Sequence, residues 1–123
     1  MSCLFQSLSA FIKNISSTDM RRMIVEYLEK DPVIFKNPDQ RLSDILNIDN
    51  VPLVHYIEMM KKDYTWGGAI EIKAFCELFS CRVIVIVLSS KKQIEFCPSV
   101  IHHKMPEFRI SWDGGHYEPI LCA

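Results

Sequence analysis

The sequence lacks the features that mark secreted, membrane-spanning and disulfide-bonded proteins. Its longest continuous apolar stretch, Val83 to Leu88, has the length of a strand and falls far short of the roughly 18 residues of a membrane span. Met1 to Phe5 lacks the basic segment and cleavage site of a secretory signal. The five cysteines form no CxxC pair, and their odd number favours free thiols in a reducing compartment. We therefore expect a cytoplasmic protein without a membrane segment.

An excess of charge of either sign is also missing. The chain carries 14 basic and 15 acidic residues, so its formal net charge is -1. This balance offers no attraction to a phosphate backbone, and we expect no nucleic-acid partner. A chain of 123 residues with 49% hydrophobic and 24% charged residues suits one globular domain over residues 1–123, without repeats.

Helical spacing of apolar residues dominates the first two thirds of the chain. Ser16 and Asp19 have the spacing of a capping box, which predicts the start of the second helix. The helices that we predict are about residue 4 to Asn14, Thr18 to Lys30, Leu42 to Leu46, Val54 to Lys61, and one from near Ile70 to about Phe79.

Strand patterns fill the last third. The strands that we predict are Arg82 to Leu88, Gln93 to Cys97, Phe108 to Trp112 and His116 to Leu121. The first of them is β-branched without alternation, which predicts cover on both of its faces. Helices come first and strands follow, so the expected class is α+β, with helices packed on a small, mostly antiparallel sheet.

Cys3 is the cysteine that stands at the predicted start of a helix. A helix N-terminus and a nearby imidazole both stabilise a thiolate, which is the nucleophilic form of cysteine. On spacing alone, a purely structural role for Cys3 stays open beside this one. The other cysteines are interpreted as small core or half-buried residues; they are Cys76, Cys81, Cys97 and Cys122.

His116 follows a Gly-Gly turn and opens the last predicted strand. Glu118, two residues on, shares its face because side chains alternate along a strand. A carboxylate there can fix the imidazole tautomer and stabilise its charged form. The alternative is an edge-strand histidine beside an unrelated carboxylate. His102 and His103 have no matching ligand set for zinc, so no metal site is expected.

The turn at Trp66, Gly67 and Gly68 admits two interpretations. Structurally, it is an aromatic plug before a helix. Functionally, glycines allow the backbone to approach an extended peptide, and a tryptophan can wall a narrow channel. Glu71 either pairs with a basic substrate residue or is simply an acid in the first turn of a helix, where the helix dipole favours negative charge.

These pieces occur in a fixed order: Cys3-Leu4-Phe5 opening a helix, Thr65-Trp66-Gly67-Gly68 followed by Glu71, and Gly115-His116-Tyr117-Glu118 near the end. The ordered set resembles the ovarian-tumour (OTU) family of cysteine proteases over almost the entire chain. The resemblance implies a papain-like fold of the OTU type and a monomer that needs no cofactor. It also implies cleavage after the Gly-Gly tail of ubiquitin or a ubiquitin-like modifier. The residues that it implies are Cys3 as nucleophile, His116 as base, Glu118 as the third member, and Trp66, Gly67, Gly68 and Tyr117 along the substrate channel.

The sequence departs from the family pattern at two places. The position two after the histidine is usually Asp or Asn, and here it is the longer Glu118. Family members also carry an Asp-Gly-x segment before the nucleophile, whose N–H groups help to form the oxyanion hole. Only Met1 and Ser2 precede Cys3, so the backbone of Ser2 and Cys3 supplies the expected donors, and losing one donor costs roughly 3 kcal/mol. A weak or silent OTU-like module that binds ubiquitin is therefore the alternative function.

Overall fold

Residues 3–121 are described by the computed structural model, which has five helices and six strands in that range. The helices are α1 (Cys3–Ser9), α2 (Ser17–Glu29), α3 (Leu42–Asn47), α4 (Leu53–Met60) and α5 (Ala69–Phe79). The strands are β1 (Val33–Phe35), β2 (Gln40–Arg41), β3 (Arg82–Val87), β4 (Lys92–Phe96), β5 (Glu107–Trp112) and β6 (Tyr117–Ile120). Within residues 3–121, no helix is long and apolar enough to cross a membrane.

Helix α2 confirms the capping prediction. The Ser16 hydroxyl accepts a hydrogen bond from the Asp19 N–H at 3.0 Å, which satisfies one of the open donors of the first turn. Its apolar stripe, including Met20, Ile24 and Leu28, is buried.

Helix α1 is shorter than predicted, because it ends at Ser9 and not near Asn14. Beyond it, the Phe11 and Ile12 N–H groups bond three residues back, as in a tightened terminal turn. The Phe11 ring leaves the helical path to stack on Phe108 of β5, with ring centroids 4.6 Å apart. This tertiary contact replaces the helical continuation that the apolar spacing predicted.

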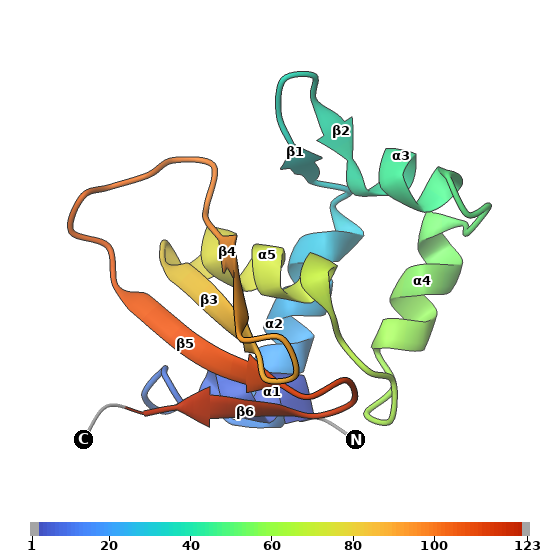
Figure 1. The fold of residues 1–123 in the computed structure, drawn as a ribbon. Helices are drawn as coiled ribbons and strands as arrows, with labels where there is room; N and C mark the ends of the chain where they lie inside the picture. The colour runs from blue at the N-terminus through green and yellow to red at the C-terminus, as the bar shows by residue number, and fades with distance from the viewer. Residues whose placement is uncertain (1–2, 122–123) are drawn as a thin grey trace.

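The main sheet has the strand order β4-β3-β5-β6. The β3–β4 and β5–β6 pairs are antiparallel, as predicted for most of the sheet, while the central β3–β5 pair is parallel, with Val85 opposite Ile110. A parallel pair needs a crossover, and here β4 and the long loop of residues 97–106 supply it (Figure 1).

The expectation that β3 is covered on both faces holds for only half of the strand. Val83, Ile84 and Val85 are buried, whereas Ile86 and Val87 are partly exposed. The short β1–β2 hairpin was absent from the sequence prediction, because runs of three and two residues are too short for periodicity to detect.

Helices α1, α2 and α5 build the core with the sheet. Phe5, Phe75 and Ile110, from α1, α5 and β5, are fully buried in one cluster. Helix α1 lies against β6, so the first and last elements of the chain are neighbours, while α3, α4 and the β1–β2 hairpin lie to one side of the sheet (Figure 1).

Candidate active site

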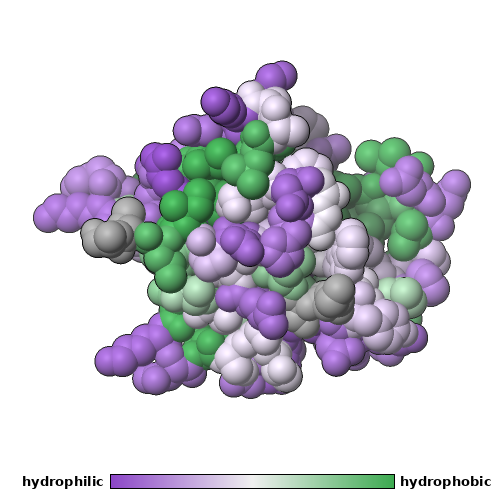
Figure 2. Space-filling model, turned by 60° about the horizontal axis from the view of Figure 1, so that its bottom comes forward, coloured by the Kyte–Doolittle hydropathy of each residue, from purple (hydrophilic) through white to green (hydrophobic). Residues whose placement is uncertain are grey.

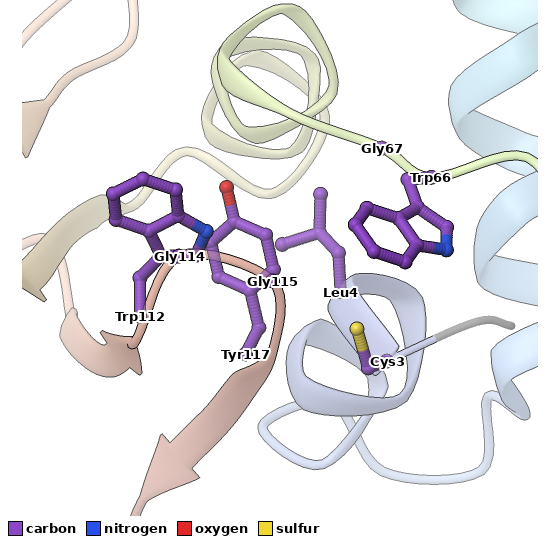
Figure 3. A pocket seen from close by; sticks show the side chains of 8 residues that line it. All are labelled: Cys3, Leu4, Trp66, Gly67, Trp112, Gly114, Gly115 and Tyr117. Carbon is purple, nitrogen blue, oxygen red and sulfur yellow. The ribbon is translucent and has the colours of Figure 1, made fainter.

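Cys3 is the first residue of α1, and its side chain borders a groove of about 200 Å³. The groove lies between three segments that are far apart in sequence: the start of α1, the loop before α5, and the β5–β6 turn (Figure 3). Its lining residues are Cys3, Leu4, Trp66, Gly67, Trp112, Gly114, Gly115 and Tyr117. A thiol therefore opens into a narrow channel walled by aromatic rings and glycine backbone.

The glycine at position 67 allows the loop before α5 to touch α1. A Cβ at Gly67 would lie 2.8 Å from Leu4 Cδ2 and 3.1 Å from the Phe5 ring, and both side chains are buried. A larger residue would push the loop off the helix that carries Cys3. Trp66, the residue before Gly67, is 60% exposed. Its ring extends toward the β5–β6 turn, where a Cβ at Gly115 would lie 3.7 Å from the ring.

The β5–β6 turn is shaped by Asp113. Its Oδ1 accepts hydrogen bonds from the backbone N–H of His116 at 2.9 Å and of Gly115 at 3.3 Å. Gly114 has a φ of 101°, a conformation that favours glycine. The turn thus brings Gly115 and Tyr117 to the groove, with His116 between them.

His116 and Glu118 form the predicted pair. The ring Nε2 lies 3.0 Å from Glu118 Oε1, so the extra methylene of the glutamate does not prevent contact. The Nδ1 atom is left for an exchange of protons with a neighbouring group. Both side chains are largely exposed, and among the hydrogen bonds of residues 3–121 none joins His116 to Cys3. Hydrogen bonds between catalytic groups are often long or poorly aligned in an enzyme before its substrate binds.

Tyr117 lines the groove, as predicted, and Trp112 is a lining residue that the sequence analysis assigned only to a strand. The two rings are paired across β5 and β6, with centroids 6.4 Å apart (Figure 3). Trp112 alternates in phase with Phe108 and Ile110 and ends its strand at the turn, which is the signal that could have identified it. Burial, the Cys3 sulfur and the Glu71 carboxyl raise the pKa of Tyr117, so its hydroxyl stays a hydrogen-bond donor.

Two other predicted positions, Gly68 and Glu71, are absent from the lining of this groove. Gly68 precedes α5, gives its N–H to Glu71 Oε1 at 2.7 Å, and is absent from the lining of the groove. Glu71 is 1% exposed and also accepts a hydrogen bond from Tyr56, so it caps the helix and cannot meet a basic substrate residue. Ser2 lies outside the described residues.

The remaining described cysteines are placed as the sequence indicated. Cys76 and Cys81 are buried, Cys97 is half-buried, and all three are free thiols, as Cys3 is. Of these four, Cys3 is the one that borders the groove.

Comparison with known proteins decides the family. The family model described as OTU-like cysteine protease matches residues 2–117, which is nearly the whole chain. The chain belongs to the OTU family of cysteine proteases. Its α+β architecture is thus the OTU fold that the ordered motifs predicted.

Curated OTU relatives align along almost all of this chain. Ubiquitin thioesterase OTU1 of Mus musculus is 27% identical over 97% of the chain, and that of Danio rerio is 24% identical over 97%. These matches cover 33% and 38% of the relatives, so the chain spans about a third of the length of the curated proteins that it matches.

Solved OTU structures superpose on the same fold. An OTU domain in complex with ubiquitin matches with a TM-score of 0.74 and 25% identity, covering 96% of this chain and 62% of that one. The OTU domain of OTUD1 gives a TM-score of 0.75 at 16% identity, covering 98% of this chain and 79% of that one. An OTU deubiquitinase from Wolbachia pipientis wMel bound to ubiquitin gives 0.64 at 19% identity, covering 98% and 89%.

Proposed function

We propose that this OTU domain is a thiol-dependent deubiquitinase that hydrolyses bonds after the Gly-Gly tail of ubiquitin or a ubiquitin-like modifier. The observation that carries the proposal is the convergence of the start of α1 and the β5–β6 turn on one groove, which Cys3 lines together with Gly115 and Tyr117, the neighbours of His116 in the sequence. The groove is narrow and lined by Trp66 and by glycine backbone, so an unbranched tail fits it better than an ordinary peptide.

The mechanism follows from the groups at the groove. The Cys3 thiol gives its proton to His116 and attacks the carbonyl carbon of the terminal glycine. His116 returns the proton to the leaving lysine amine, and water activated by the same ring then hydrolyses the thioester. Glu118, bonded to Nε2, holds the ring with Nδ1 free and stabilises its charged form.

The relatives support this choice of substrate. Several carry the name ubiquitin thioesterase, and two of the solved OTU domains are bound to ubiquitin. The face of the molecule that carries α1 and β6 has both apolar and polar patches (Figure 2). Such a mixed composition is typical of surfaces that bind protein partners transiently. The cytoplasmic location and the monomeric state stay predictions.

The test is hydrolysis of a ubiquitin fluorogenic amide and of lysine-linked di-ubiquitin. We expect turnover by the wild type, and its loss in Cys3→Ser and in His116→Gln. Cys97→Ser is the matched control, since Cys97 is also a half-buried free thiol but lies outside the groove, and it should retain activity. Binding of ubiquitin without turnover would instead favour the silent module.

A further inference from the structure

We propose that Arg21 of α2 is a positioning residue that holds the Trp66–Gly67 loop against α1 and thereby sets the groove for the substrate tail. The proposal rests on the proposed function for the identity of that tail. Arg21 does not line the groove, so its effect is exerted through the loop and through Phe5.

The Arg21 guanidinium donates hydrogen bonds to backbone carbonyls of the segment that precedes Trp66. Arg21 is 5% exposed, and its Nη1 donates to the Met60 carbonyl at 2.8 Å. Its Nη2 donates to the carbonyls of Asp63 at 3.2 Å and Thr65 at 2.8 Å. One buried side chain thus donates to the carbonyl of the last residue of α4 and to two carbonyls of the loop that follows, the second of them one residue before Trp66.

The same guanidinium also touches the helix that carries the nucleophile. It stacks over the Phe5 ring, with Cζ 4.2 Å from the ring centroid. The Phe5 ring in turn contacts Gly67, since a Cβ there would lie 3.1 Å from Cε2. Phe5 therefore joins Arg21 to Gly67, and it stands two residues after Cys3.

This geometry requires arginine and not just a positive charge. The planar fork presents several N–H donors in fixed directions and can stack on an aromatic ring at the same time. A lysine carries one compact ammonium on a flexible stem, so it cannot serve Met60, Asp63 and Thr65 together from the face of Phe5. Carbonyls that lose their donor in a buried place must find water or move.

Among the described residues, none of the hydrogen bonds or ring contacts of Arg21 reaches Cys3 or His116 directly. Asp113 and Glu118 fix His116, and Cys3 is placed by α1 itself, through the first helical turn. Loosening the loop should thus weaken capture of the tail while leaving the Cys3 thiol as reactive as before toward a small reagent.

The experiment compares Arg21→Lys and Arg21→Met with Arg22→Lys and Arg22→Met. Arg22 is the adjacent residue of α2. Its side chain is 58% exposed and forms ion pairs with Asp19 and Glu26 of its own helix, so it is a matched control. Each protein is measured for hydrolysis of ubiquitin fluorogenic amide, for alkylation of Cys3 by iodoacetamide, and for amide hydrogen exchange by mass spectrometry.

For both Arg21 variants we expect KM to rise about tenfold with kcat changed about twofold or less. Alkylation of Cys3 should match the wild type, and hydrogen exchange should accelerate in residues 61–68 without an equal rise in β3 and β5. The Arg22 variants should match the wild type in all three measurements.

Two results would overturn the proposal. Exchange in residues 61–68 that matches the wild type means that Arg21 does not hold the loop, and an equal rise over all of residues 3–121 means a general structural role. Hydrogen exchange needs no substrate, so it decides the role of Arg21 even if the wild type proves inactive on ubiquitin, a result that would overturn the proposed function alone.

Discussion

At the scale of single residues, the proposed mechanism needs the Glu118 carboxylate to orient the His116 ring, a task that most family members give to the shorter Asp or Asn. Glu118 of β6 lies 3.0 Å from Nε2 of His116, the residue that immediately precedes this strand. The spacing of two residues places both side chains on one side of extended backbone. Under the proposed mechanism, this contact leaves Nδ1 of His116 as the nitrogen that exchanges a proton with Cys3.

This role predicts the effect of Glu118→Ala. The variant should fold normally, because the Glu118 side chain is 67% exposed, and its turnover should fall about tenfold or more as the ring loses its orientation. Steady-state kinetics beside thermal unfolding measures both. Glu58→Ala, another exposed glutamate far from the groove, is the control. Unchanged turnover in Glu118→Ala would remove this carboxylate from the mechanism.

The neighbouring glycines at 67 and 68 are predicted to behave differently. Gly67→Ala places a Cβ 2.8 Å from Leu4 Cδ2, so we expect a loss of roughly 1–3 kcal/mol of unfolding free energy and a displaced Trp66. Gly68→Ala meets nothing within 4 Å and should cost less than about 1 kcal/mol, the cost of alanine at an N-cap. Chemical denaturation of the pair tests this, and equal losses would contradict the close approach.

At the scale of elements, the start of α5 combines a cap with a buried acid. Glu71 accepts hydrogen bonds from the Gly68 N–H and the Tyr56 hydroxyl, and it sits within the field of Arg21. Burial raises its pKa above the ordinary 4.5, while these partners oppose the rise.

A pH-dependent stability follows from Glu71. Because its folded pKa is raised, the carboxyl binds a proton more tightly in the folded protein than in the unfolded chain. Its contribution to stability is complete below the ordinary pKa of 4.5 and is lost as pH rises through the raised value. We expect the unfolding free energy of the wild type, relative to Glu71→Gln, to fall as the pH rises above 4.5 and through the raised pKa of the carboxyl. A difference that stays constant with pH would show that the carboxyl is not shifted.

The elements also show where sequence patterns succeed. Helices α2, α4 and α5 and the four strands of the main sheet lie within one or two residues of their predicted bounds. The three helices and β3 bury a regular apolar stripe or a β-branched run, which is the pattern that sequence reading detects best. The predicted first helix was too long, because the spacing of apolar residues carries no information about the stacking of Phe11 on Phe108. The β1–β2 hairpin was missed because its strands carry too few residues to show a period.

At the scale of the whole molecule, pairing between distant segments builds the site. Strand β5 ends at Trp112, opposite the last residue of β3, and Trp112 and the β5–β6 turn line the same groove as Cys3 at the start of α1. Sequence motifs named Cys3, Trp66, His116 and Tyr117, but the residues between those motifs complete the groove. Trp112 lines it, and Arg21 of α2 bonds to the loop that carries Trp66. No local sequence pattern predicts either contact.

The most direct test of the account is to react the purified protein with ubiquitin bearing a thiol-reactive group at its C-terminus and to map the adduct by mass spectrometry. The account predicts one adduct on Cys3, its absence in Cys3→Ala, and a rate that falls about tenfold or more in His116→Gln. An adduct on Cys97, or one on Cys3 that forms equally fast without the imidazole, would contradict it.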